Sequence, residues 1–166
     1  VGMSVTNVSN YCKEDLADYV MACIYHFNKP VLSYKKAMND GLWGAQAVEK
    51  PIHRISGSTL LVIGLGRIGK TVAAKGKALG MKVMAYDPYI SSEEMKAHGV
   101  EKVSWDQGLR NADFISVNAI LTQETEGLIT YSDFQKMKPS AYLINTARGK
   151  IINEHDMICA VNGGLI

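Results

Sequence analysis

Short apolar runs alternate with segments of helical spacing from about residue 59 onward. The runs typical of buried strands lie at residues 59–63, 82–86, 113–118 and 141–145. From Leu60 to Ile63 every position is apolar, as expected of a parallel strand that is covered on both faces. The pattern therefore predicts a sheet of parallel strands.

A helical segment follows each of these predicted strands. Apolar residues after position 64 recur at helical spacing as far as Gly80, which stands where a helix C-cap belongs. Short helices are predicted from Ser91 and Ser104, because each serine has a glutamate or glutamine three residues later, as in a capping box. Later helices are predicted near residues 130–137 and from Asn153. Strands and helices in this alternation predict an α/β fold: a Rossmann-type, doubly wound parallel sheet with its ligand crevice at the carboxyl ends of the strands.

Two further helices are predicted before the sheet begins. The first covers about residues 13–27, and Pro30 can open a second one that ends near Gly41. The first helix has a more apolar face than a solvated helix needs. The residues of that face include Tyr19, Val20, Cys23, Ile24 and Phe27.

The composition is that of one well-buried domain. Of the 166 residues 47% are hydrophobic and 20% charged, and the formal net charge is +2. Lysines and arginines are scattered, which argues against nucleic acid as a partner, and no apolar run approaches a membrane span. Cys12, Cys23 and Cys159 form no C-x-x-C pair and suit a reducing cytosol. No histidine has a partner at metal-ligand spacing, so no metal site is predicted.

A glycine-rich segment, Gly64-Leu65-Gly66-Arg67-Ile68-Gly69, stands between the first predicted strand and the helix after it. In a G-x-G-x-x-G loop, the first glycine permits a tight turn and the second lets the backbone approach a pyrophosphate. The third glycine lets helix and strand pack closely, and the phosphates lie at the helix N-terminus. Such a spacing can arise by chance in a chain with 15 glycines, so its context has to support it.

Asp87 supplies that context. It ends the second predicted strand, 18 residues after Gly69, close to the offset at which an acidic residue binds the adenosine ribose. A carboxylate accepts hydrogen bonds from the ribose hydroxyls and repels a 2′-phosphate, so the prediction is NAD rather than NADP. The alternative is an ordinary turn residue before Pro88.

Four polar or glycine-rich segments each end or follow a predicted strand. Because parallel strands end at one edge of a sheet, these segments should share one crevice. They are residues 64–69, Asp87, residues 118–122 and residues 146–149.

The segment Asn145-Thr146-Ala147-Arg148-Gly149, together with the glycine loop and Asp87-Pro88, resembles the D-isomer-specific 2-hydroxyacid dehydrogenases, and the resemblance covers nearly the whole chain. Within that family the chain looks most like the branch of phosphoglycerate dehydrogenases and C-terminal-binding-protein corepressors. Other segments that look like the family are Val5-Thr6-Asn7, Tyr11-Cys12 to Asp18, Gly41-Leu42-Trp43, Tyr86-Asp87-Pro88-Tyr89, Leu121-Thr122 with Thr125, and Met137-Lys138-Pro139.

The resemblance implies roles for residues along this edge. Arg67 and Ile68 would contribute backbone groups at the pyrophosphate, and Thr146 to Arg148 would lie at the nicotinamide end. The full set of implied cofactor-binding residues is Gly64, Gly66, Arg67, Ile68, Gly69, Asp87, Asn118, Thr125, Thr146, Ala147 and Arg148.

Arg148 matches the catalytic arginine that holds the substrate's carboxylate and keto oxygen. Its planar guanidinium can donate two parallel hydrogen bonds to a carboxylate, which lysine cannot do. Without the surrounding motif, an arginine after a strand would usually be a surface residue. The family mostly has histidine and proline where this chain has Asn118 and Ile120, and an amide at position 118 can hydrogen-bond cofactor or substrate but cannot carry a proton at neutral pH.

The family's proton donor is a histidine tuned by a glutamate, and both would lie beyond Ile166 in family order. His155 falls in the first turn of the last predicted helix, and its family counterpart is not catalytic. We therefore expect the central piece of a longer protein. Residues 1–50 would form an N-terminal helical segment and interdomain linker, and residues 51–166 a Rossmann domain truncated at its C-terminus.

Three functions are open at this stage. The chain can be the NAD-binding domain of a cytoplasmic dehydrogenase for a small D-2-hydroxy or 2-keto acid, predicted to bind NAD but to be inactive alone. It can be an NAD(H)-sensing scaffold like the corepressors, or a structural fragment without function. In the family the N-terminal helices support dimer contacts, so the apolar face of the first helix can serve a homodimer or pack within the monomer.

Overall fold

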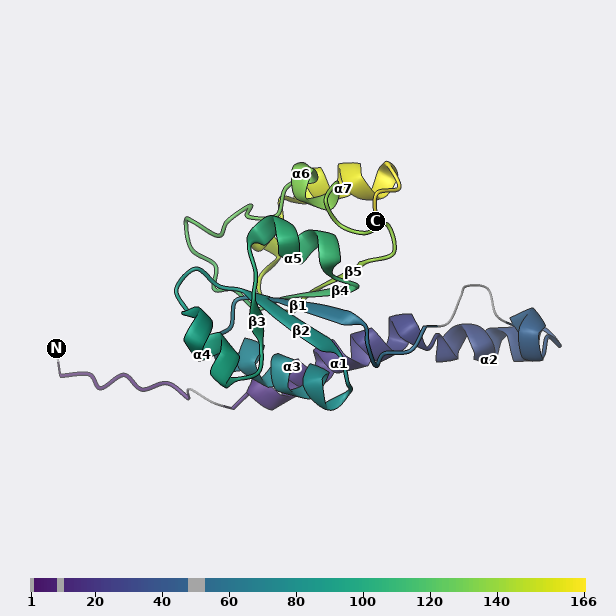
Figure 1. Cartoon of the computed structure of the whole chain (residues 1–166), viewed down its shortest axis with the longest axis horizontal. Helices are drawn as coiled ribbons and strands as arrows, with labels where there is room; N and C mark the ends of the chain where they lie inside the picture. The colour runs from purple at the N-terminus through teal and green to yellow at the C-terminus, as the bar shows by residue number, and fades with distance from the viewer. Residues whose placement is uncertain (1, 9–10, 48–52) are drawn as a thin grey trace.

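A five-stranded parallel sheet forms the centre of the molecule in the computed structural model, which describes residues 2–8, 11–47 and 53–166 (Figure 1). The strands are β1 (Thr59–Ile63), β2 (Lys82–Tyr86), β3 (Glu101–Lys102), β4 (Phe114–Val117) and β5 (Tyr142–Asn145). Their order is β3-β2-β1-β4-β5, and all four pairings are parallel. This order is that of a doubly wound dinucleotide-binding sheet, so the predicted fold class is confirmed.

Helices cover both faces of the sheet (Figure 1). Leu60 and Val62 point into a core shared with α1 (Lys13–Asn28), α3 (Arg67–Ala78) and α4 (Ser92–Ala97). Leu61 and Ile63 point the other way, because side chains alternate along a strand. They pack with α5 (Trp105–Asn111), α6 (Tyr131–Phe134) and α7 (Glu154–Asn162). The remaining elements are α2 (Val31–Asn39) and the 3-10 turns η1 (Gly44–Ala47) and η2 (Gly149–Ile151).

The predicted helix caps are confirmed. The side chain of Ser91 accepts a hydrogen bond from the backbone N–H of Glu94 at 3.1 Å, and Ser104 does the same for Gln107 at 3.3 Å. Asn153 caps α7 through the N–H of Asp156 at 3.1 Å. The helix predicted near residues 130–137 is only the four-residue α6.

Helix α1 packs against α3 within the monomer. Val20 and Ile24 are fully buried there, and Lys75 on α3 forms ion pairs with Glu14 at 3.1 Å and Asp18 at 2.8 Å. The opposite part of the predicted apolar face is not covered, since Tyr19 is 63% exposed. Core packing therefore uses part of this face. The predicted domain boundary between residues 50 and 51 lies outside the described residues.

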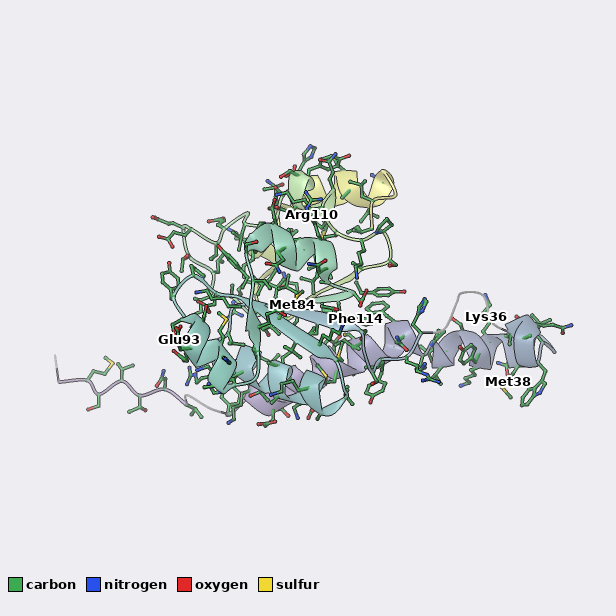
Figure 2. All side chains as sticks on the ribbon, in the orientation of Figure 1. Lys36, Met38, Met84, Glu93, Arg110 and Phe114 are labelled. Atoms are coloured by element: carbon green, nitrogen blue, oxygen red, sulfur yellow. The ribbon has the colours of Figure 1, made fainter. Side chains whose placement is uncertain are left out.

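Helix α2 projects from the body of the molecule, with Lys36 and Met38 far from the sheet (Figures 1 and 2). Only Ala37 is buried on this helix. One prediction about the sheet was wrong: Tyr142 and Leu143 on β5 are only partly buried, because β5 is an edge strand of the described sheet. Edge position covers a strand less than the centre does, and the apolar run alone could not reveal it.

Candidate cofactor and substrate site

Four strands end side by side at one edge of the sheet. Ile63 at the end of β1 pairs with Tyr86 at the end of β2 and with Val117 at the end of β4, and Val117 pairs with Asn145 at the end of β5. The loops after these strands therefore start level with one another. With neighbouring strands about 4.8 Å apart, the row from β2 to β5 is about 14 Å long. The loops predicted to line the crevice thus gather along the carboxyl ends of the strands.

The three glycines of the loop after β1 have different surroundings. Gly64 has a φ of +87°, and a Cβ there would lie 2.8 Å from the backbone nitrogen of Ala119. A Cβ at Gly69 would overlap the carbonyl oxygen of Gly64. A Cβ at Gly66 would meet no atom within 4 Å. Gly64 and Gly69 are therefore required by packing, whereas Gly66 leaves open space beside the start of α3.

The open space lies where a helix offers N–H donors. Gly66 is the N-cap of α3, and no side chain caps this end. Arg67 and Ile68 are the first helical residues, and the side chain of Ile68 packs into the core, so Ile68 can offer only its backbone to a ligand. An uncapped helix N-terminus favours an anion, both through its N–H groups and through the helix dipole.

Asp87 joins the glycine loop to the loop after β2. Its Oδ2 accepts the backbone N–H of Leu65 at 2.9 Å, and its Oδ1 accepts that of Tyr89 at 2.9 Å. An ionised carboxylate has about four acceptor positions, so about two remain. That number matches two ribose hydroxyls, and Asp87 is therefore a fixed acceptor at the β2 end of the row.

The loop after β4 carries a buried acceptor without a partner. The Asn118 side-chain nitrogen donates to the carbonyl oxygen of Ser116 at 3.1 Å and to its hydroxyl at 3.0 Å, while the amide oxygen of Asn118 is buried with no hydrogen bond. Leaving a buried acceptor unpaired costs about 1–3 kcal/mol. Asn118 is thus suited to accept a hydrogen bond from a bound group.

Thr125 has its hydroxyl occupied within its own loop. The hydroxyl donates to the carbonyl oxygen of Ile120 at 2.6 Å and accepts the N–H of Thr122 at 2.8 Å. These bonds fold the loop back on itself beside Asn118. The geometry gives Thr125 a role in shaping the loop, and its contact with a cofactor stays a prediction.

Asn145 holds the loop after β5. Its side-chain oxygen accepts the N–H of Ala147 at 3.0 Å, and its side-chain nitrogen donates to the carbonyl oxygen of Arg148 at 2.9 Å. These two bonds close the turn that includes Thr146. Sequence reasoning did not single out Asn145, although an asparagine directly after an apolar run is a signal for such a turn.

Arg148 is exposed at the β5 end of the row. Its guanidinium donates to the carbonyl oxygen of Ala147 at 2.8 Å, and no carboxylate of the described residues forms an ion pair with it. A guanidinium has five N–H donors, so most are free to bind a carboxylate. The structure thus places an available cation at the opposite end of the row from Asp87.

Tyr89 and Glu124 form a contact that sequence reasoning also missed. The Tyr89 hydroxyl donates to Oε2 of Glu124 at 2.6 Å. This hydrogen bond, followed by the Glu124 charge, raises the pKa of Tyr89 above its ordinary value. Tyr89 ends the segment Tyr86-Asp87-Pro88-Tyr89, but no sequence pattern pairs it with Glu124, because the loops that carry the two residues are far apart in sequence.

The residues present fit a dinucleotide. Gly66 leaves open space at the start of α3, Asp87 has spare acceptor positions and Asn118 has an unpaired side-chain oxygen.

Within the described ranges, no three His, Cys, Asp or Glu residues could hold a metal ion together. None of the helices in the described part of the chain has the length and hydropathy of a membrane span.

Known proteins match this chain along almost its full length. The family model described as D-isomer specific 2-hydroxyacid dehydrogenase, NAD binding domain, matches residues 21–166. A glycerate dehydrogenase of Methylorubrum extorquens is 31% identical over 169 residues, which is 99% of this chain and 51% of that protein. A D-3-phosphoglycerate dehydrogenase of Mycobacterium tuberculosis is 34% identical over 98% of this chain and 30% of its own length.

Solved structures give the same match. The D-lactate dehydrogenase of Aquifex aeolicus, complexed with NAD and lactic acid, superposes with a TM-score of 0.88 at 33% identity, over 97% of this chain and 48% of that one. This chain therefore spans about half the length of that structure and of the glycerate dehydrogenase, and less than a third of the phosphoglycerate dehydrogenase.

Proposed function

Because the chain belongs to the D-isomer-specific 2-hydroxyacid dehydrogenases and matches their NAD-binding domain, we propose that it forms the cofactor half of an enzyme that interconverts a D-2-hydroxy acid and its 2-keto acid. The observation that carries the proposal is the row of strand ends, with an open glycine position at a helix N-terminus in its middle. Asp87 flanks that position on one side, and Asn118 and Arg148 on the other.

Each residue along the row binds a different part of the cofactor. Asp87 accepts hydrogen bonds from the adenosine ribose, and the backbone at Gly66, Arg67 and Ile68 lies against the pyrophosphate. The unpaired side-chain oxygen of Asn118 accepts a hydrogen bond from the nicotinamide half. The reduced cofactor, NADH, would supply a hydride to the keto carbon, and NAD would accept one in the reverse direction.

Arg148 is the residue proposed to hold the substrate. Two parallel hydrogen bonds from its guanidinium to the substrate carboxylate fix the direction of the neighbouring keto carbon. The same positive charge stabilises the negative charge that grows on the oxygen as hydride arrives. Asn145 positions Arg148 by holding the loop backbone.

The proton for that oxygen needs a separate acid. His155 does not supply it: its ring nitrogen lies 3.8 Å from the sulfur of Cys159 on α7, on the helix rather than along the row of strand ends. In the family that the sequence resembles, this acid is a histidine paired with a glutamate, and none of the loops after β1, β2, β4 and β5 that form the row carries a histidine. We therefore expect the 166 residues to bind NADH without turning over 2-keto acids.

Titration of the chain with NADH, followed by fluorescence, tests the proposal. Asp87→Ala should weaken NADH binding at least about tenfold, because the ribose loses its acceptors. Asp40→Ala removes the same charge from the end of α2 and should leave the affinity unchanged. No binding by the unchanged chain at millimolar NADH would overturn the proposal, and an Asp87→Ala affinity equal to that of the unchanged chain would overturn the ribose assignment.

We also propose that the chain forms a homodimer, with α2 and η1 as the main contact. Val31 and Leu32 at the start of α2 and Trp43 beyond its end are 66%, 65% and 74% exposed, so this projecting segment presents large apolar side chains along its length. A cavity of about 800 Å³ at the junction of α1 and α2 contains the unpaired buried polar atoms of Asn28 and Tyr34. Light scattering should give twice the chain mass, and a strictly monomeric chain would refute the dimer.

The three free cysteines of the chain support a reducing compartment, and we propose the cytosol.

A further inference from the structure

A hydrogen bond joins the loops on either side of the glycine loop. Tyr89 follows β2 and Glu124 follows β4, and their side chains meet at 2.6 Å. Figure 1 shows the loop after β4 and the loop from β2 to α4 on the same side of the sheet. Because β1 lies between β2 and β4, the contact crosses the carboxyl end of β1, where the glycine loop begins.

The contact brings the Glu124 charge to the Asp87 side of the crevice. The backbone N–H of Tyr89 bonds to Asp87, and the hydroxyl at the other end of the same residue bonds to Glu124. Both carboxylates raise the pKa of Tyr89, after the hydrogen bond to Glu124 itself. One tyrosine therefore links Glu124 to Asp87, the residue predicted to bind the ribose.

The Glu124 charge is not neutralised. No lysine or arginine of the described residues forms an ion pair with it, whereas Glu126, two residues later, pairs with Lys150 at 3.3 Å. Its hydrogen bond to a neutral hydroxyl orients the carboxylate and leaves its full charge. An exposed, unpaired charge is felt over about 8–10 Å at moderate salt, a range that includes its near neighbours.

We propose that Glu124 is a second determinant of cofactor choice, held in place by Tyr89, and that it acts with Asp87 to exclude a cofactor that carries a 2′-phosphate. The inference rests on the proposed NAD function. Asp87 acts through hydrogen bonds that the ribose hydroxyls can make and a phosphate cannot. Glu124 adds repulsion at longer range, which acts weakly on the pyrophosphate of both cofactors and additionally on the 2′-phosphate that only NADPH carries. Tyr89 is a positioning residue in this arrangement.

The test is the ratio of the dissociation constants for NADPH and NADH, measured by fluorescence titration. Glu124→Gln keeps an acceptor for Tyr89 and removes the charge, so NADPH binding should tighten about three- to tenfold with NADH changed less than about twofold. This gain should shrink as salt is raised, because screening already weakens the repulsion in the unchanged chain. Tyr89→Phe should shift the ratio in the same direction by a smaller factor.

Glu126→Gln is the matched control. It removes the same charge from the same loop, at a carboxylate that pairs with Lys150 rather than with Tyr89, so we expect a smaller change in the ratio than for Glu124→Gln. A Glu124→Gln ratio equal to that of the unchanged chain, or equal gains for both cofactors, would overturn the inference while the proposed function stands. Binding of neither cofactor to the unchanged chain would overturn the proposed function and this inference with it.

Discussion

Gly69→Ala should destabilise the fold, whereas Gly66→Ala should weaken cofactor binding with little loss of stability. Gly69 is buried in the first turn of α3, and a Cβ there would overlap the carbonyl oxygen of Gly64 and lie 3.1 Å from Cγ1 of Val62. The overlapped atom belongs to the backbone, so no side chain can rotate away. Helix α3 has to move from β1 to admit the methyl group.

The size of the effect follows from two opposing contributions. Overpacking costs about 1–3 kcal/mol, and the higher helix propensity of alanine returns up to about 1 kcal/mol. Because the clash is with backbone, we place Gly69→Ala at a net loss of about 1–2 kcal/mol. Gly66 faces open space, so Gly66→Ala costs less than about 1 kcal/mol, from replacing a glycine N-cap by alanine.

Two assays separate these substitutions. Urea unfolding followed by circular dichroism measures the free energy of unfolding, and fluorescence titration measures NADH binding. Gly66→Ala should lose about tenfold or more in NADH affinity, because its methyl group occupies the space that the pyrophosphate needs. If Gly66→Ala bound NADH normally, or lost as much stability as Gly69→Ala, the different roles assigned to the two glycines would be wrong.

Two further predictions concern Arg148 and Asp133. In a full-length enzyme that contains this chain, Arg148→Ala should reduce 2-keto acid turnover at least about a hundredfold while NADH affinity changes less than about twofold; retained turnover would refute the substrate role. Burial opposes the charge on Asp133 most strongly, but hydrogen bonds from Trp105, Thr130 and Lys136 outweigh it and lower the pKa below its ordinary 3.8. A lowered folded-state pKa contributes stability above the unfolded value that is lost as pH falls through the folded one. Asp133→Asn should therefore lower the free energy of unfolding in urea by about 1–3 kcal/mol at neutral pH. The difference between the variant and the unchanged chain should disappear only below about pH 4.

Sequence predicted those parts of the fold that depend on neighbouring residues. The caps at Ser91, Ser104 and Asn153 each join a side chain to a backbone N–H three residues later, so their signal lies within one turn. The strand before Gly64 is apolar from Leu60 to Ile63 because it lies in the middle of the sheet. Such features can be recognised without knowing what packs against them.

Features that depend on distant partners could not be predicted in the same way. β3 is only two residues long, which is too short to show a period. The division of the α1 face into buried Val20 and exposed Tyr19 depends on where α3 lies. The contact between Tyr89 and Glu124 joins residues 35 positions apart through two loops. In each case the missing information is the position of another element, which no local pattern contains.

The contact between the glycine loop and Asp87 is also long-range, yet the spacing between them in the sequence predicts it. Helix α3 has 12 residues and so runs about 18 Å back along the sheet, and the five residues of β2 return about 17 Å to the same edge. The two lengths have to match for the Asp87 carboxylate to reach the N–H of Leu65. The interval of 18 residues is therefore fixed by the closure of one β-α-β unit, so it predicts the position of Asp87 from the position of the glycine loop. No comparable closure links the loops after β2 and β4, which is why Glu124 could be found only in the structure.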